Sequence, residues 1–243
     1  MLDLLAFDLD GTLADTESLK AESYGWAAHE LRPDLDPADV ERAYEPYVGG
    51  GREHIASSLL HELGLEDAAR RHDPTVEPWE SFVGLRLDRY RAMLRDAALV
   101  RRHGLPAARE VVEEARDLAR FVAVVTTTDR PNALPVLDAL GLHGAFDAVI
   151  TSDDVDENKP DPAGYDLALD RFGADPARSL AVEDSPSGAR AALAAGLDVV
   201  VVPSDLTRAG IAALVRDGVL PAASVVEPDA LAEAVRQRAA ALR

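Results

Sequence analysis

The sequence of 243 residues contains no cysteine. This absence excludes disulfide bonds, thiolate nucleophiles and cysteine-based zinc sites. Long apolar runs are also missing, since the longest stretch without a charged residue, 218–226, is too short to span a bilayer. No basic region precedes the apolar N-terminal segment, as it would in a secretory signal. We therefore expect a cytoplasmic protein whose functional site is built from oxygen and nitrogen atoms.

Positive charge is scarce as well. The 44 acidic residues exceed the 25 basic ones, and the net charge of −19 repels phosphate backbones and anionic lipids. We expect neither nucleic acid nor a membrane as a partner. Lysine is especially rare, because Lys20 and Lys159 are the only two. Hydrophobic residues at 47% and charged residues at 28% are typical of a globular enzyme.

What the sequence does contain is an alternation of short apolar runs and helix-forming segments. Near-continuous runs of Val, Ile, Leu and Ala indicate strands that are covered on both faces. The alternation predicts an α/β fold with a doubly wound, Rossmann-like parallel sheet. The expected strands span residues 4–8, 121–126, 148–151, 180–183 and 199–202, with a further one over 224–226.

Capping residues mark the expected starts of three helices. Ser185 before Pro186, and Asp161 before Pro162, each combine an N-cap with a proline at the first helical position. Asn132 is expected to cap the third helix. Each helix is expected to end at a glycine, namely Gly141, Gly173 or Gly196.

A long segment after the first strand contains no strand-like run. Its apolar residues recur at helical spacing, for example Leu19 with Trp26 and Phe82 with Leu85. We therefore predict a small helical cap domain over residues 15–100, inserted into a core domain formed by residues 1–14 and 101–243. Residues 101–106 are the expected return linker.

Two acidic pairs follow expected strands. Asp8 and Asp10 lie where the first strand runs out, and Glu183 and Asp184 end a later strand. Ligands of open parallel sheets bind beyond the carboxyl ends of the strands. Carboxylates this close favour a bound cation, and oxygen ligands suit Mg²⁺. The alternatives are an Asp-Gly turn for the first pair and an acidic helix start for the second.

Hydroxyl groups and a lysine follow two other strands. Thr126, Thr127 and Thr128 offer hydroxyl and backbone N–H groups suited to holding a phosphate, with a local turn as the alternative. Lys159 precedes Pro160, which favours an extended backbone and so helps to fix the direction of the lysine. The alternative for Lys159 is a solvated surface position.

Together these features resemble the four motifs of the haloacid dehalogenase (HAD) superfamily of phosphotransferases. The matching residues, in order, are 8–12, Thr126, Lys159 and 183–184, and the helical insertion resembles the small cap of that family. The segments 159–162 and 183–188 are typical of one group within it. That group contains CbbY-like phosphatases, phosphoglycolate phosphatase and β-phosphoglucomutase.

The resemblance implies covalent phosphoryl transfer. Asp8 would be the nucleophile that forms an aspartyl phosphate, and Asp10 would be the general acid and base. Thr126 and Lys159 would hold the phosphoryl oxygens. Dehalogenase chemistry is disfavoured, because a halide leaving group needs no proton from Asp10.

The resemblance also implies a Mg²⁺ cofactor. Its ligands would be Asp8, the main-chain carbonyl of Asp10 and Asp184, with Glu183 reaching the ion through water.

The expected substrate-binding residues are Lys20, Arg52, Thr127 and Thr128. Lys20 stands where many relatives carry a histidine on the first cap helix, which puts mutase activity in doubt. Arg52 follows three glycines and resembles the family's substrate loop, with a surface arginine as the alternative.

The sequence therefore predicts a Mg²⁺-dependent phosphatase for a small phosphorylated metabolite, either a sugar phosphate or a phosphoglycolate-like acid. A phosphosugar mutase of the β-phosphoglucomutase type is the close alternative, since both use an aspartyl phosphate. A non-enzymatic phosphoacceptor or binding protein is the remote one. The sequence does not determine the oligomeric state, and a monomer is compatible with it.

Overall fold

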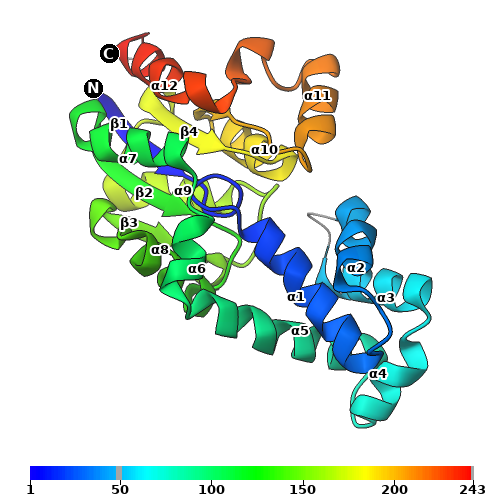
Figure 1. The fold of residues 1–243 in the computed structure, drawn as a ribbon. Helices are drawn as coiled ribbons and strands as arrows, with labels where there is room; N and C mark the ends of the chain where they lie inside the picture. The colour runs from blue at the N-terminus through cyan, green and yellow to red at the C-terminus, as the bar shows by residue number, and fades with distance from the viewer. Residues whose placement is uncertain (48–50, 242–243) are drawn as a thin grey trace. The chain divides into compact units, whose positions relative to one another are not determined.

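The computed structural model describes residues 1–47 and 51–241. The chain forms two compact units (Figure 1). The core unit comprises Met1–Asp15 and Ala97–Arg243, and the helical unit comprises Thr16–Asp96. The chain thus leaves the core unit directly after its first strand and loop, and it returns at Ala97, at the start of a helix.

The core unit is built on a parallel sheet of five strands in the order β3-β2-β1-β4-β5. Phe7 at the end of β1 pairs with Val124 of β2 on one side and with Val182 of β4 on the other. The carboxyl ends of the three central strands therefore lie at one edge of the sheet. The strands are β1 (Leu2–Phe7), β2 (Ala119–Val125), β3 (Ala148–Ile150), β4 (Ser179–Glu183) and β5 (Asp198–Val201).

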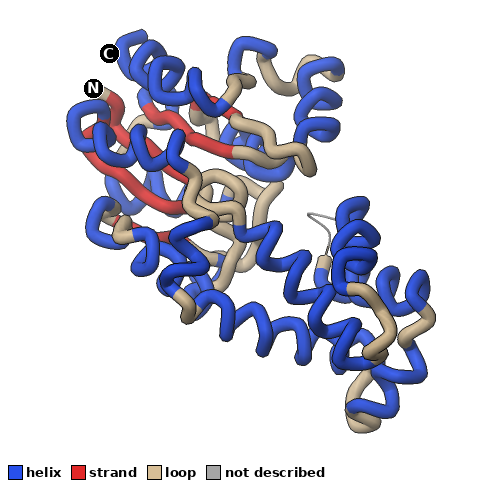
Figure 2. The backbone as a smooth tube through the Cα atoms, in the orientation of Figure 1, coloured by secondary structure: helices blue, strands red, loops and turns tan. Residues whose placement is uncertain are grey.

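Helices cover both faces of this sheet, as Figure 2 shows in blue around the red strands. Alternate strand residues such as Leu4 and Ala6 share one buried cluster with residues of α9, α10 and α11. On the other face α7 contacts β1 and β2, and α12 packs against α7. The helices are α6 (Ala97–Arg102), α7 (Pro106–Leu118), α8 (Arg130–Leu140), α9 (Ala163–Phe172), α10 (Pro186–Ala194), α11 (Arg208–Arg216) and α12 (Leu231–Ala241). The doubly wound α/β fold predicted from the sequence is confirmed.

Short 3-10 turns connect these elements. They are η2 (His143–Ala145), η3 (Ser152–Asp154), η4 (Pro176–Arg178), η5 (Ala222–Ser224) and η6 (Pro228–Ala230). The strand predicted over 224–226 is wrong, because η5 occupies its start and only Val225 forms an isolated bridge to Val201.

The predicted cap of α8 is also wrong. Asp129, not Asn132, is the N-cap, and its side chain accepts a hydrogen bond from the backbone N–H of Asn132. Pro131 occupies the first turn, where a missing N–H costs little, and Pro135 lies inside the helix. Of the two other predicted starts, Ser185 caps α10 as expected. The predicted start of α9 is wrong by one residue, because Pro162 stands at the N-cap position and the helix begins at Ala163, although Asp161 accepts a hydrogen bond from Ala163 N.

The described residues of the helical unit form helices joined by short loops and contain no strand, as the spacing of its apolar residues indicated. Its core contains Tyr24, Tyr44, Leu59 and Phe82, which come from four different helices. The helices are α1 (Thr16–Leu31), α2 (Pro37–Tyr44), η1 (Glu45–Tyr47), α3 (Arg52–Leu63), α4 (Glu66–His72) and α5 (Pro78–Leu94). Within residues 1–47 and 51–241, no helix combines the length and the apolar character that a membrane span requires.

Candidate active site

The candidate active site lies at the edge where β1, β2 and β4 end. Asp8 directly follows β1 and continues its ladder, because its backbone N–H donates to Val182 O at 3.0 Å. Thr126 follows β2 in the same way and donates its N–H to Ile150 O at 2.9 Å. Glu183 is the last residue of β4. Residues that are far apart in the sequence therefore meet because parallel strands end at the same edge.

A buried lysine connects two of these carboxylates. Lys159 Nζ donates to Asp8 Oδ1 and to Glu183 Oε1, both at 2.6 Å, and to Val125 O at 2.8 Å. The side chains of Lys159 and Asp8 are 5% and 9% exposed, and that of Glu183 is fully buried. Lys159 is therefore not a solvated surface residue, and each of its three N–H groups has an acceptor.

Burial dominates the electrostatics of this cluster. It raises the pKa of Asp8 well above the usual carboxyl range, and although Lys159 opposes this shift, Glu183 and Asp10 add to it. Burial also acts to lower the pKa of Lys159, but Asp8 and Glu183 outweigh it and raise that pKa well above its usual value. One lysine thus faces more carboxylates than it can neutralise.

Three of the carboxylates are placed to bind a cation. Asp8, Glu183 and Asp184 are buried and offer oxygen atoms that all lie within 4.8 Å of one another. Gly11, with φ of +84°, brings the chain so close to Asp184 that a Cβ atom there would lie 2.3 Å from Asp184 Oδ2. An all-oxygen donor set with unbalanced negative charge fits a hard divalent cation such as Mg²⁺.

Asp10 lies beside the threonines that follow β2. Thr128 Oγ1 donates to Asp10 Oδ2 at 2.5 Å, and Thr126 Oγ1 donates to the same oxygen at 3.3 Å. Thr128 N donates in turn to Thr126 Oγ1 at 3.1 Å. The side chain of Thr127 is exposed and takes no part in this network. The hydroxyls of Thr126 and Thr128 thus both bond to Asp10 in this structure, and their contacts with a phosphate stay a prediction.

Glu183 is packed against the start of α10. Its Oε2 lies 3.3 Å from Asp184 N and 3.4 Å from Ser185 Oγ, and Ser185 caps the helix by accepting from Gly188 N at 3.0 Å. A Cβ atom at Gly188 would lie 2.0 Å from Glu183 Oε2. Only glycine leaves room at this position for the buried carboxylate.

We expect Gly188→Ala to displace Glu183 and to lower kcat/KM about 100-fold, the upper range for disturbing a residue that orients a metal site. The added methyl group should also lower stability by about 1–3 kcal/mol, because no open space receives it. Kinetics and thermal melting measure the two effects. Gly144→Ala is the matched control, since a Cβ atom there meets nothing within 4 Å. Wild-type kcat/KM for Gly188→Ala would contradict this account of Glu183.

The two predicted cap residues lie in the helical unit. Lys20 Nζ donates to Glu17 Oε1 at 2.6 Å, and Glu17 also accepts from Tyr44 OH at 2.8 Å. Arg52 is exposed at the first position of α3. Of the glycines before it, only Gly51 lies within the described residues.

One residue of the helical unit was missed at the sequence level. Arg86 on α5 is only 7% exposed, and its guanidinium carbon lies 5.0 Å and 4.7 Å from the ring centroids of Tyr24 and Tyr90. Its Nε has no hydrogen-bond partner among the described residues. Arg86, Arg52 and Lys20 all act to lower the pKa of Tyr24, although burial outweighs them and raises it. The spacing of Arg86 four residues before Tyr90 was the available signal, but an arginine within an apolar helix commonly extends to solvent.

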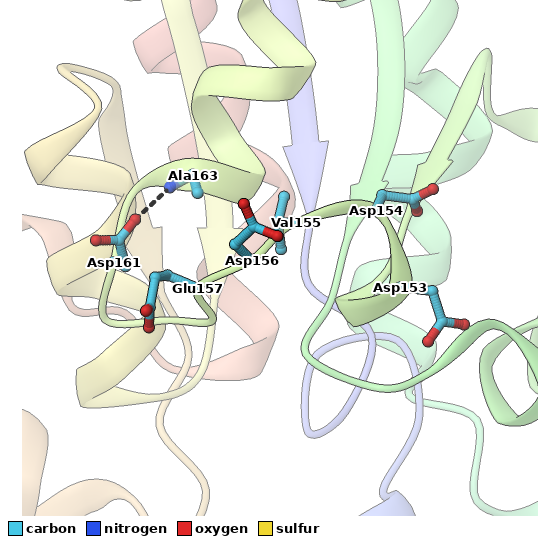
Figure 3. Close-up of a pocket in the computed structure, with 7 residues that line it drawn as sticks. All are labelled: Asp153, Asp154, Val155, Asp156, Glu157, Asp161 and Ala163. Atoms are coloured by element: carbon cyan, nitrogen blue, oxygen red, sulfur yellow. Dashed lines mark hydrogen bonds between the residues drawn. The ribbon is translucent and has the colours of Figure 1, made fainter.

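A second acidic feature lies in the loop between β3 and α9, shown in Figure 3. A hollow of about 330 Å³ is lined by Asp153, Asp154, Val155, Asp156, Glu157, Asp161 and Ala163. Several of its carboxylates already serve local structure. Asp154 accepts from Thr151 and Arg130, and Asp161 accepts from Ala163 N, the dashed line in Figure 3. These bonds shape the loop that carries Lys159.

The buried cluster of Lys159, Asp8 and Glu183 lies where doubly wound α/β enzymes bind their ligands, beyond the carboxyl ends of the strands. Comparison with known proteins identifies the class of enzyme. The sequence model of the haloacid dehalogenase-like hydrolases matches residues 2–196, and a second, HAD-hydrolase-like model matches residues 157–237.

Individual relatives match over most of their length. Protein CbbY of Cereibacter sphaeroides is 33% identical over 211 residues, covering 86% of this chain and 87% of that protein. The phosphorylated carbohydrates phosphatase of Thermotoga maritima is 28% identical over 222 residues, covering 88% and 94%. A crystal structure of mutant CbbY from Rhodobacter sphaeroides with xylulose-1,5-bisphosphate matches with a TM-score of 0.67 and 28% identity over 96% of each chain.

The chain belongs to the haloacid dehalogenase-like hydrolase family. It is an enzyme of the phosphatase group of that superfamily, similar to the CbbY proteins. The family, the fold and the enzyme class predicted from the sequence are confirmed.

Proposed function

We propose that this enzyme hydrolyses a small phosphorylated metabolite, a sugar phosphate by preference, in a Mg²⁺-dependent reaction through a phosphorylated Asp8. The observation that carries the proposal is the buried bonding of Lys159 to both Asp8 and Glu183, with Asp10 two residues beyond the nucleophile. This arrangement holds a carboxylate in a fixed direction and offers a second acid nearby, which covalent phosphoryl transfer requires.

In the first step a carboxylate oxygen of Asp8 attacks the phosphorus atom, and the bond from phosphorus to the ester oxygen breaks. Asp10 gives a proton to the departing oxygen. In the second step Asp10 takes a proton from water, which attacks the phosphorus of the aspartyl phosphate. Inorganic phosphate and the free carboxylate of Asp8 result. The hydroxyls of Thr126 and Thr128 keep Asp10 at the site between these proton transfers.

Lys159 stabilises the charge of the phosphoryl group in this scheme. Because all three of its N–H groups already have acceptors, a phosphoryl oxygen must replace one of them when substrate binds. Asp8, Asp184 and the main-chain carbonyl of Asp10 would hold Mg²⁺, with Glu183 reaching the ion through water. The grouping of the Asp8, Glu183 and Asp184 carboxylates within 4.8 Å supports this assignment. When bound, the ion offsets the negative charge of the carboxylates and the phosphoryl group.

The positively charged side chains of the helical unit support a substrate with a second negatively charged group. The guanidinium carbon of the buried Arg86 lies 5.0 Å from the centroid of the Tyr24 ring, and the charges of Lys20 and Arg52 act with that of Arg86 to lower the pKa of Tyr24. A remote phosphate or carboxylate is the group that such cations recognise. The bisphosphate bound to the CbbY relative fits that description. We propose a sugar bisphosphate or a similar dianionic phosphate ester as the substrate class, with a phosphoglycolate-like acid as the smaller alternative.

The direct test is phosphate release from a panel of phosphorylated sugars and acids, with and without Mg²⁺. We expect turnover that requires Mg²⁺ and that favours doubly anionic compounds. ³¹P NMR of the products separates inorganic phosphate from a phosphate moved to a second hydroxyl, which the mutase alternative requires. Absence of turnover on the whole panel by the folded protein would overturn the proposal.

We expect Lys20→Ala and Arg52→Ala to lower kcat/KM for the preferred bisphosphate about 10–100-fold, but to change it less than about 3-fold for p-nitrophenyl phosphate. Remote binding energy helps only a substrate that has a remote group to bind. Arg70→Ala, which removes an exposed arginine of the same unit, is the matched control for charge. Equal losses on both substrates would assign the two residues to chemistry or stability.

A further inference from the structure

A buried tyrosine lies behind the carboxylate cluster. Tyr165 on α9 is fully buried and belongs to the apolar cluster between the sheet and α9, α10 and α11. Its hydroxyl donates to Glu183 Oε1 at 2.7 Å. An unbonded hydroxyl in such surroundings is costly, so the bond to Glu183 fixes both groups.

Tyr165 also contacts the lysine of the site. Lys159 Nζ lies 5.1 Å from the centroid of the Tyr165 ring and donates to the same Glu183 oxygen that accepts from the tyrosine. A cation over an aromatic face is stabilised without occupying one of its N–H groups. One side chain therefore contacts two members of the cluster, through its hydroxyl and through its ring.

The consequence concerns the direction of the Glu183 carboxylate. Oε1 is held from the core side by Tyr165 and Lys159, whereas Oε2 has only the longer contacts with Asp184 N and Ser185 Oγ. Without the tyrosine hydroxyl, Lys159 alone would hold Oε1. The carboxylate could then turn toward the lysine, and Lys159 could move away from Asp8. Burial, followed by the charge of Glu183, raises the pKa of Tyr165 well above its usual value, so the hydroxyl stays a donor.

We propose that Tyr165 is a positioning residue, whose hydroxyl keeps Glu183 at the spacing from Asp8 and Asp184 at which the three carboxylates bind a divalent cation. The ring of Tyr165 keeps Lys159 directed at Asp8. The inference rests on the proposed function, because it assigns the cluster to Mg²⁺ and to phosphoryl transfer. Tyr165 acts through its neighbours and does not touch the substrate in this account.

The test is calorimetric titration of the substrate-free protein with Mg²⁺, in wild type and in Tyr165→Phe. We expect the variant to bind Mg²⁺ about 10-fold more weakly, as for other residues that orient metal ligands. The Mg²⁺ concentration for half-maximal activity should rise by the same factor, while KM for the phosphate ester stays within about 2-fold. Ser179→Ala is the matched control, since it removes a buried hydroxyl from the opposite end of β4 and should leave Mg²⁺ binding unchanged.

A double-variant cycle separates positioning from a general loss of packing. Glu183→Gln should weaken Mg²⁺ binding by itself, and adding Tyr165→Phe to it should cause no further loss, because the hydroxyl acts through that carboxylate. Thermal melting checks that each variant is folded. If Tyr165→Phe alone does not fold because the buried Glu183 carboxylate loses its partner, Glu183→Gln removes that buried charge, and the Mg²⁺ affinities of Glu183→Gln and the double variant are compared instead. A further loss of affinity in the double variant overturns the inference.

The outcomes for the two proposals are distinct. Wild-type protein that binds no Mg²⁺ and hydrolyses nothing overturns the proposed function and the inference with it. A different result overturns only the role of Tyr165. In that case the wild-type protein binds Mg²⁺ and hydrolyses phosphate esters, and Tyr165→Phe binds Mg²⁺ with unchanged affinity. Fully additive losses in the double-variant cycle likewise overturn only that role.

Discussion

Asp8→Asn should abolish turnover, with a loss in kcat of about 10⁴-fold or more, while the protein stays folded. The amide has nearly the volume of the carboxylate and keeps an oxygen that can accept from Lys159, so the hydrogen bond at this position survives. It is a very poor nucleophile toward phosphorus. Phosphate release and circular dichroism measure the two parts of this expectation.

The stability of Asp8→Asn offers an independent check. Burial, Glu183 and Asp10 raise the pKa of Asp8, so its ionised form is disfavoured in the folded state. A carboxyl group with a raised folded pKa lowers stability as the pH rises above its unfolded value of about 4. In Mg²⁺-free buffer at neutral pH, the variant should therefore melt at or above the wild-type temperature.

An acyl phosphate trapped on another residue of the wild type would contradict the assignment of the nucleophile.

Asp10→Asn should lower kcat about 10³-fold for a sugar phosphate and leave substrate binding nearly unchanged. The amide still accepts from Thr128 and Thr126, so its place in the loop is kept, but it cannot transfer a proton. Steady-state kinetics over a range of pH measures the loss. A variant with wild-type kcat across that range would make Asp10 a turn residue only.

The two halves of the reaction should respond differently to Asp10→Asn. p-Nitrophenolate leaves without a proton, so the first step should remain fast with p-nitrophenyl phosphate. The second step still needs a base to activate water. We expect a burst of nitrophenolate close to one equivalent per enzyme, followed by slow turnover, and rapid-mixing absorbance measures it. Loss of the burst together with the steady-state rate would show that Asp10 serves the attack of Asp8 itself.

The cluster that this chemistry uses is unfavourable for the isolated fold. Lys159 is the cation that bonds Asp8 and Glu183, while Asp184 lies beside them and Asp10 adds to the raised pKa of Asp8. Burying more carboxylates than cations costs free energy, which apolar packing elsewhere in the core unit must offset. A divalent cation relieves the same imbalance, which is why Mg²⁺ binding and stability should be linked.

The strands and the edge that carries the site were predictable from the sequence. Runs of apolar residues ended at Asp8, Thr126 and Glu183 within one residue of the strand ends in the structure. The topology of parallel sheets then places those ends together without further information. The short run at 224–226 failed as a strand because a three-residue pattern cannot show that a 3-10 turn will occupy its start.

The partners of the individual side chains were not predictable. Thr126 and Thr128 were predicted to bind a phosphate, but nothing in the sequence showed that their hydroxyls also bond to Asp10. Tyr165 lies in a helical segment without any feature that links it to Glu183, 18 residues later. The spacing of Arg86 four residues before Tyr90 did not show by itself that the guanidinium would be buried against two tyrosine rings.

By itself, the sequence determined the α/β class, the order of the motifs and the family to which the enzyme belongs. These properties follow from the local periodicity of apolar residues and from the residue types next to strand ends. Both features can be recognised within short segments of the sequence. Only the tertiary structure decided that Lys159 bridges Asp8 and Glu183, that the threonines hold Asp10, and that Tyr165 supports the cluster from the core. Each of these contacts joins residues that are far apart in the sequence. Whether their side chains meet therefore depends on how whole helices and strands pack.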